Sequence, residues 1–299
     1  MIVEIQDLWK RFGGHNVLQG LDLAITEGSA FALVGPNGAG KTTTIKILLN
    51  LLDRTRGRTA IFGVNSRALS PRELSDIGYV SENQRLPGRL TVAEYLDYLR
   101  PFYQKWDHAL EISMCEQMQL PPARKLSELS HGMRIKTALV CALAYRPRLL
   151  VLDEPFAGLD PLVRDELIEG LLGQAGNLTI LISSHELSEI ETFTTDIGFL
   201  HCGKMMFQEP MSRLFDRCRE VYITLDSTAE LPEPLPPHWL QPRAAGNVLT
   251  FVETQFTDES LGELVRMLCR GVRQIDARPM TLRAIFTALA SAARNGVLS

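Results

Sequence analysis

Gly35-Pro-Asn-Gly-Ala-Gly-Lys41-Thr42 is the most informative segment of the sequence. It matches the pattern GxxxxGK(S/T), and it lies between an apolar run at residues 31–34 and a segment with helical spacing of apolar residues at 42–52. Glycines allow backbone N–H groups to turn inward around phosphate oxygens, and the start of a helix adds a favourable dipole. The segment therefore predicts a phosphate-binding loop between a buried strand and a helix.

The residues of this loop have distinct expected roles. Lys41 is expected to reach the β- and γ-phosphates of ATP, and the Thr42 hydroxyl is expected to bind Mg²⁺. The nucleotide is expected to contact the whole loop and the residue after it, a set that comprises Gly35, Pro36, Asn37, Gly38, Ala39, Gly40, Lys41, Thr42 and Thr43. A glycine-rich turn with an incidental lysine is the alternative, and the flanking strand and helix patterns disfavour it.

Two acidic residues follow a second apolar run, at residues 149–152. Asp153 and Glu154 are thereby placed at the C-terminal end of a predicted strand, where ligands gather in open α/β sheets. Asp153 is expected to hold Mg²⁺, directly or through water, and Glu154 is expected to polarise the attacking water as general base. Together with the loop, this pair predicts a P-loop ATPase.

The composition limits the possible classes of protein. A chain of 299 residues that is 45% apolar can form one substantial core and a smaller lobe. A net charge of -4 provides no basic field for nucleic acid, so no nucleic-acid partner is expected. Five scattered cysteines favour a reducing cytosol over a disulfide framework or a zinc site. The start lacks a signal-peptide pattern, and no apolar run approaches the ~20 residues that span a bilayer.

The order of patterns along the chain predicts two domains. Strand patterns fill residues 2–34, helical patterns dominate residues 90–119, and strands alternate with helices from residue 148 to residue 200. Such alternation implies a mainly parallel sheet covered by helices. A proline-rich stretch near residue 231 lies within a predicted α+β extension. We expect a main domain at residues 1–217, with a helical subdomain at about 86–130, and an extension at 218–299.

A family resemblance appears at Leu129-Ser130-His131-Gly132-Met133, between the two motifs. This segment resembles the signature LSGGQ of ABC ATPases, with His131 in place of the first glycine and Met133 in place of the glutamine. The resemblance implies that Ser130 and Gly132 bind the γ-phosphate of ATP held by another subunit. The two departures predict a signature that contributes less to closure on ATP than LSGGQ would.

Further ABC landmarks follow in order. Ala157-Gly-Leu-Asp160 looks like the D-loop, which implies that Asp160 lies at a dimer interface. His185 resembles the switch histidine, which implies a catalytic role beside Glu154 and Lys41.

Three more positions resemble nucleotide or metal contacts of the family. Phe12 is similar to the aromatic residue that stacks on adenine, with Val17 beside it, although core packing is an alternative for Phe12. Glu82 stands where most relatives have a glutamine that binds Mg²⁺, and Gln84 is the alternative ligand.

The resemblance covers about residues 2–215, and it implies an α/β fold of the ABC type: a P-loop NTPase core with a mixed sheet, an antiparallel β subdomain and a helical insertion, followed by a small α+β C-terminal lobe. It implies an ATPase with ATP and Mg²⁺ as cofactors, acting as a homodimer or heterodimer beneath transmembrane permease subunits. The chain would then be cytoplasmic and peripheral on the inner face of the cell membrane.

The residues around the phosphate loop and the tail at residues 278–286 are similar to those of ATPase subunits of ABC-2-type exporters. The resemblance therefore favours export. An importer with a regulatory C-terminal lobe, a polysaccharide exporter and a soluble ABC ATPase are alternatives. A P-loop kinase or GTPase is disfavoured by the signature segment, the D-loop and the histidine. The transported substrate is not encoded in any of these motifs.

Overall fold

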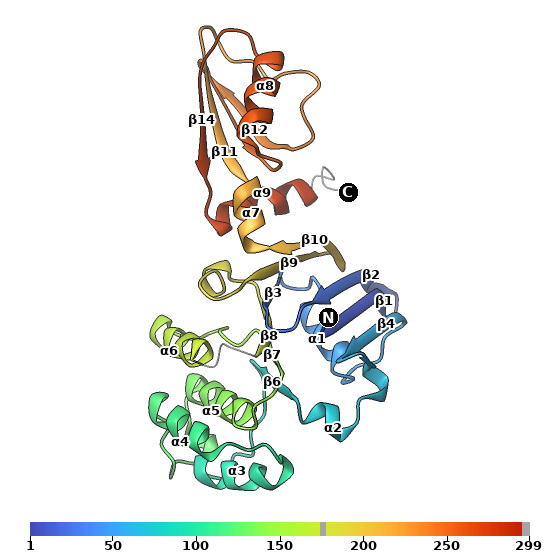
Figure 1. The fold of residues 1–299 in the computed structure, drawn as a ribbon, viewed down its shortest axis with the longest axis vertical. Helices are drawn as coiled ribbons and strands as arrows, with labels where there is room; N and C mark the ends of the chain where they lie inside the picture. Colours follow the sequence, from blue (N-terminus) through green and yellow to red (C-terminus); the bar gives the residue numbers. More distant parts are fainter. Residues whose placement is uncertain (174–177, 295–299) are drawn as a thin grey trace. The chain divides into compact units, whose positions relative to one another are not determined.

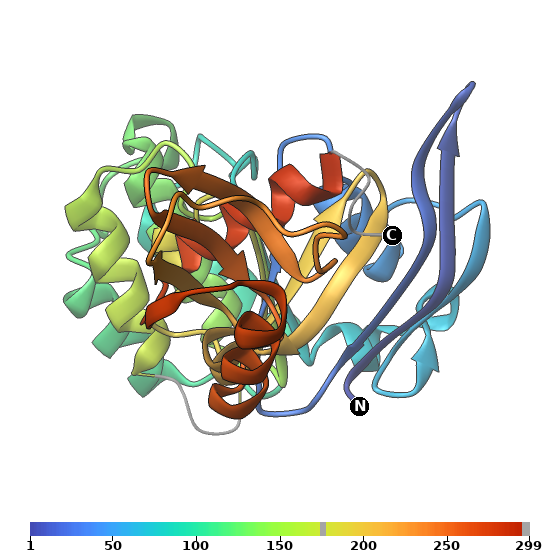
Figure 2. The same cartoon turned by 90° about the horizontal axis from the view of Figure 1, so that it is seen from above.

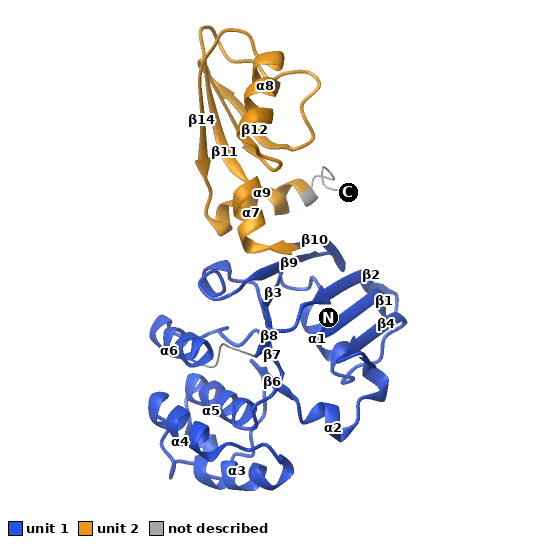
Figure 3. Ribbon diagram, viewed as in Figure 1, with its two compact units in different colours: residues 1–208 blue, residues 209–299 orange. Residues whose placement is uncertain are grey.

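The computed structural model describes residues 1–173 and 178–294 and divides them into two compact units, Met1–Gln208 and Glu209–Ser299 (Figures 1 and 3). The last residues of the expected extension, 295–299, lie outside this description. The division comes earlier than the boundary expected at residue 217. Arg217 explains the difference, because it forms an ion pair with Glu209 at 2.6 Å and donates to the Thr254 carbonyl at 2.8 Å. Both partners belong to the second unit, so the segment that contains Arg217 folds with it.

The first unit contains an antiparallel sheet of order β2-β1-β4-β5. Its strands are β1 (Val3–Phe12), β2 (His15–Ile25), β4 (Arg56–Ile61) and β5 (Val64–Asn65). Gly13, with φ +54°, lies in the turn between β1 and β2. The long β1–β2 hairpin is clear in Figure 2. This sheet is the expected antiparallel β subdomain.

A second sheet in the first unit has the order β10-β9-β3-β8-β7-β6. Its strands are β3 (Ala30–Val34), β6 (Ile77–Ser81), β7 (Leu149–Asp153), β8 (Thr179–Ser184), β9 (Asp196–His201) and β10 (Lys204–Pro210). The β6-β7-β8-β3-β9 pairs are parallel. Strands β3, β7 and β8 are buried almost throughout, and β3 and β7 are also apolar almost throughout, as expected for a parallel sheet covered on both faces.

Helix α1 (Lys41–Leu48) joins the two sheets of the first unit, because it contacts both β4 and β7. One apolar core includes Leu21 of β2, Leu33 of β3 and Ile45 of α1. The expected helix at 42–52 ends earlier, since the chain turns at Asn50 with φ +56°. Burial of this core fixes the phosphate loop that precedes α1.

The remaining helices of the first unit are α2 (Pro71–Leu74), α3 (Val92–Leu99), α4 (His108–Gln117), α5 (His131–Leu143) and α6 (Pro161–Leu172). Helices α3, α4 and α5 gather beside β6 (Figure 1). Helix α3 begins with a capping box, in which Thr91 and Glu94 exchange hydrogen bonds. In the region where strands were expected to alternate with helices, the segment before β9 forms only a 3-10 turn, at Leu187–Glu189.

The described residues of the second unit, 209–294, include an antiparallel sheet and three helices. Its sheet has the order β12-β13-β11-β14, with strands β11 (Arg219–Leu225), β12 (Trp239–Ala245), β13 (Val248–Glu253) and β14 (Val272–Pro279). Its helices are α7 (Met211–Arg217), α8 (Asp258–Leu268) and α9 (Leu282–Arg294). Leu261 and Val265 of α8 pack with Phe251 and Trp239 in a separate core. This unit has the α+β character expected from the sequence.

Candidate active site

The phosphate loop connects the C-terminal end of β3 to the start of α1. Gly38 and Gly40 have φ angles of +82° and +112°, a region that residues with a Cβ rarely adopt. A Cβ added to Gly40 would lie 2.6 Å from Leu18 Cδ2, whereas one added to Gly38 would meet nothing within 4 Å. The loop is therefore tightly packed on its inner side and open at Gly38.

Lys41 is turned inward, with only 5% of its surface exposed. Its Nζ donates to the carbonyls of Gly35 at 2.7 Å and Pro36 at 3.3 Å. The same nitrogen lies 3.0 Å from Glu154 Oε1. A buried ammonium requires such partners, because an unpaired charge away from water is costly.

Asp153 ends β7 and is 4% exposed. Its Oδ1 accepts hydrogen bonds from the Thr42 hydroxyl at 2.9 Å and from the Ser183 hydroxyl at 2.7 Å. The parallel register places Ser183 of β8 directly beside Asp153. Ser183 was not predicted as a site residue, and only the adjacent Ser-Ser-His sequence at a strand end could have indicated it.

Glu154 has an unusual backbone conformation for a residue other than glycine, with φ +52°. Its N–H donates to Ser183 Oγ at 3.0 Å and to the Ser183 carbonyl at 3.2 Å. Its two carboxylate oxygens have different partners, since Oε1 faces Lys41 and Oε2 lies 2.7 Å from His185 Nδ1. Glu154 is thus held between a cation and an imidazole at the ends of β7 and β8.

A pocket of about 480 Å³ opens above these groups, a volume suited to a small organic ligand. The structure brings most of the predicted site residues to its wall, together with Ala157, which was not predicted as a site residue. The wall comprises Val17, Asn37, Gly38, Gly40, Lys41, Thr42, Thr43, Glu82, Glu154, Ala157 and His185. Beneath the wall, Gly35, Ala39 and Asp153 are buried.

The donors at this pocket fit a hard divalent cation. The Thr42 hydroxyl and the Asp153 and Glu82 carboxylates supply oxygen, the ligand type that Mg²⁺ prefers. Glu82 lines the pocket, whereas Gln84 Oε1 accepts from the Ser81 N–H at 3.4 Å. No group of three or more His, Cys, Asp or Glu side chains within residues 1–173 and 178–294 is arranged to hold a metal. A cation at Thr42 would therefore need phosphate oxygens to complete its ligands.

Eight predicted site residues do not line this pocket: the buried Gly35, Ala39 and Asp153, the exposed Pro36, and Phe12, Ser130, Gly132 and Asp160. Phe12 is 45% exposed at the end of β1, and Lys10 Nζ lies 4.5 Å above its ring centre. Ser130 is exposed and caps α5 by accepting from the Met133 N–H at 3.2 Å. Asp160 is also exposed and caps α6 by accepting from the Val163 N–H at 3.1 Å. Gly132 is buried and packs closely against α6, where an added Cβ would lie 2.8 Å from Val163 Cγ1.

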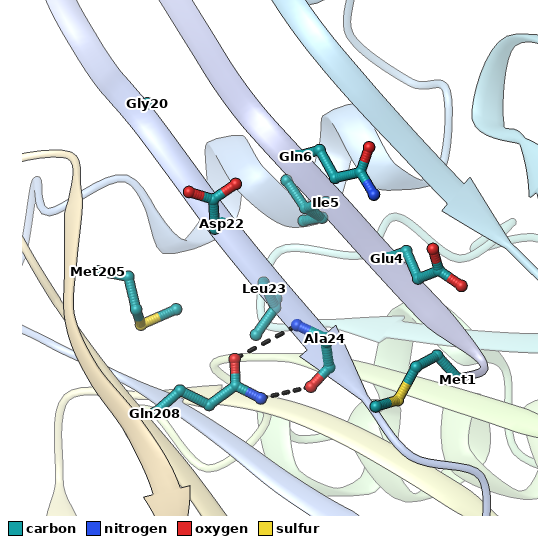
Figure 4. Close-up of a pocket in the computed structure, with 10 residues that line it drawn as sticks. All are labelled: Met1, Glu4, Ile5, Gln6, Gly20, Asp22, Leu23, Ala24, Met205 and Gln208. Atoms are coloured by element: carbon teal, nitrogen blue, oxygen red, sulfur yellow. Dashed lines mark hydrogen bonds between the residues drawn. The ribbon is translucent and has the colours of Figure 1, made fainter.

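A second pocket of the first unit, about 510 Å³, lies along β1, β2 and β10 (Figure 4). In this pocket the Gln208 side chain of β10 pairs with the backbone of β2. Its Oε1 accepts from the Ala24 N–H at 3.3 Å, and its Nε2 donates to the Ala24 carbonyl. Glu4 and Asp22 are on its wall, and its lining holds neither lysine nor arginine. Its charge is therefore unfavourable for phosphate, in contrast to the pocket at Lys41.

Comparison with known proteins decides the family. Residues 18–157 match the family model described as ABC transporter. The chain is 34% identical over 226 residues to the bacitracin transport ATP-binding protein BcrA of Bacillus licheniformis, covering 73% of each protein. The chain belongs to the ABC transporter family. It is also 33% identical to the lantibiotic transport ATP-binding protein SrtF of Streptococcus pyogenes, over 70% of this chain and 90% of SrtF.

Solved structures of ABC cassettes share the fold. One, an ATP-binding subunit of an ABC transporter, has a TM-score of 0.66 and 29% identity, covering 72% of this chain and 92% of its own. Another, the dimeric cassette MJ0796 bound to ADP and Pi, has a TM-score of 0.62 and 23% identity, covering 70% of this chain and 98% of its own.

The protein is thus an ATP-binding, ATP-hydrolysing subunit of an ABC transporter, a family whose ATPase subunits act with transmembrane permease subunits. No helix among its described residues is long and apolar enough to cross a membrane.

Proposed function

We propose that the pocket at Lys41 hydrolyses ATP with Glu154 as general base, and that turnover drives an exporter. The observation that carries this proposal is the position of Glu154, next to Asp153 and in contact with both Lys41 and His185. A general base must lie within reach of the attacking water and of a group that orients it. His185 provides that orienting contact at 2.7 Å.

Lys41 has two alternative partners in this proposal. In the structure its Nζ lies 3.0 Å from Glu154 Oε1. The β- and γ-phosphates concentrate more negative charge than one carboxylate, so ATP would draw the Lys41 ammonium to itself. Glu154 would then be free to accept a proton from water. Binding of ATP thereby prepares the base for the reaction.

The Mg²⁺ site is proposed at Thr42, Asp153 and Glu82. When bound, Mg²⁺ neutralises charge on the β- and γ-phosphate oxygens. The chain's contribution is to hold Asp153 in place, because two hydroxyls fix its Oδ1 and leave Oδ2 to other partners. The open side of the loop at Gly38 would admit the phosphates, with the N–H groups of residues 38–43 around them.

Adenine is proposed to lie against Phe12 and Val17. Phe12 is exposed, which disfavours the alternative of core packing, and Val17 is on the pocket wall. An exposed aromatic ring offers a stacking surface for a base.

A second ATPase subunit is proposed to complete the site. Ser130 and Asp160 are exposed and do not line the pocket of their own chain, so both are available to another cassette. The N-terminal end of α5, where Ser130 and Gly132 lie, carries the positive end of the helix dipole and suits a γ-phosphate. A homodimer and a heterodimer both satisfy this arrangement.

Export is proposed from the similarity to BcrA and SrtF, whose names assign them to bacitracin and lantibiotic transport. The chain would lie on the inner face of the cell membrane, attached to permease subunits. An importer whose second unit is regulatory, and a soluble ABC ATPase, remain the competing proposals. Co-purification of a permease from membranes, followed by its identification, would separate the three.

The test of the catalytic proposal is Glu154→Gln in the full chain. The variant should bind ATP and lose at least about 100-fold in kcat, because the amide cannot accept the proton. Glu186→Gln is the matched control, since Glu186 is an exposed acid on the adjacent segment; it should hydrolyse ATP normally. Steady-state phosphate release measures both variants. Wild-type turnover in Glu154→Gln would refute the role of Glu154.

A further inference from the structure

The histidine that departs from the signature pattern has a contact that glycine could not make. His131 is the first residue of α5, and its ring Nε2 lies 3.2 Å from the carbonyl oxygen of Ala157. A carbonyl oxygen can only accept, so Nε2 carries the proton and donates. Ala157 lines the nucleotide pocket. His131 therefore joins the start of α5 to the wall of the pocket.

We infer that His131 is a positioning residue for hydrolysis, which holds the loop of residues 154–160 in its reactive shape. This inference rests on the proposed role of Glu154 as general base. His131 does not line the nucleotide pocket, so it acts through Ala157 rather than on the substrate.

The loop of residues 154–160 needs such support because its backbone is strained. Glu154 has φ +52°, a region that residues with a Cβ rarely adopt. A left-handed conformation at a residue other than glycine persists only where surrounding contacts impose it. Turns within the loop supply some contacts, from the Ala157 N–H to the Glu154 carbonyl at 3.3 Å and from Leu159 to Phe156 at 3.1 Å. The His131 bond comes from another element and fixes the loop relative to α5.

The contact also connects two ends of the proposed dimer site. Ser130, next to His131, is proposed to face nucleotide held by the second subunit, and Glu154 acts on the chain's own nucleotide. Because His131 touches the loop that begins at Glu154, a shift of the α5 N-terminus changes the position of the base. Loss of the bond should thus lower kcat and leave the contacts that bind ATP intact.

Three substitutions in the full chain test this inference. His131→Gln places an amide nitrogen near the position of Nε2 and keeps the donor, while His131→Asn reaches only as far as Nδ1 and loses it. His131→Gly restores the family residue and removes the side chain. We expect kcat to fall by about fivefold in the Asn and Gly variants, the size expected for one lost hydrogen bond. KM for ATP should stay within about twofold, and the Gln variant should stay near wild type.

Two controls keep the outcomes distinct. Thermal unfolding and binding of a fluorescent ATP analogue show that each variant is folded, and the Asn variant avoids the low helix propensity of glycine. Equal kcat in the Asn, Gly and wild-type chains would overturn the inference, as would an equal loss in the Gln and Asn variants. If Glu154→Gln is inactive in the same assay, the proposed function stands in either case. If Glu154→Gln turns over normally, the proposed function itself fails.

Discussion

The hydroxyl of Ser183 is expected to stabilise the catalytic edge of the sheet, and Ser183→Ala removes it. Ser183 is fully buried, donates to Asp153 Oδ1 at 2.7 Å and accepts from the Glu154 N–H at 3.0 Å. A hydrogen bond to a charged group contributes about 1.5–3 kcal/mol. The Glu154 N–H keeps a second acceptor, the Ser183 carbonyl at 3.2 Å. Removal of Ser183 Oγ therefore costs less at this N–H than at the Asp153 carboxylate. The free energy of unfolding of the first unit should fall by about 2–3 kcal/mol.

Thermal unfolding followed by circular dichroism measures this change. For a unit of this size, about 2–3 kcal/mol corresponds to a decrease in Tm of roughly 4–12 °C. Ser29→Ala is the control, because the Ser29 hydroxyl makes one surface hydrogen bond, to the Thr26 carbonyl at 2.8 Å, and its loss should change stability by less than about 0.5 kcal/mol. If Ser183→Ala and Ser29→Ala have the same Tm, the hydrogen bonds around Asp153 do not contribute the stability assigned to them.

Two further predictions concern metal dependence and pH. Glu82→Gln should raise the Mg²⁺ concentration for half-maximal ATPase activity several-fold, while Gln84→Ala, whose side chain makes only a long contact, should not; equal effects would exclude Glu82 as the ligand. Burial raises the pKa of Glu189 above its ordinary 4.5, against the opposing effects of Ser184 and Arg164. A raised pKa for a carboxyl means that its stabilising contribution is complete below the ordinary value and is lost as pH rises through the folded value. The Tm of Glu189→Gln minus the Tm of wild type should therefore be larger at pH 7.5 than at pH 4. The same difference at both pH values would contradict this prediction.

The sequence predicted those parts of the structure that local pattern determines. The phosphate loop follows from glycine spacing between a strand and a helix, and the α/β fold follows from the alternation of patterns. Strands β12 and β14 were not predicted, because each has exposed polar positions and no sustained apolar alternation. The expected alternation of strands with helices fails between β8 and β9, where the chain forms a single 3-10 turn.

The site was predicted in its residue types and less so in its contacts. Ser183 meets Asp153 only through the register of β8 against β7, a contact between segments far apart in sequence. The pair of Lys41 with Glu154 was not predicted, because the expected role of Lys41 assumes bound phosphate. The left-handed backbone of Glu154 cannot be read from a glutamate, a residue type that seldom adopts it.

We propose that the loop at residues 35–42 forms half of an active site, which a second cassette completes. The direct measurement is ATPase activity per chain as a function of chain concentration, with sedimentation of the same samples in ATP. We predict that activity per chain rises with concentration and follows the fraction of dimer, because Ser130 and Asp160 must reach the other chain's nucleotide. Constant activity per chain in samples that sediment as monomers would contradict the claim.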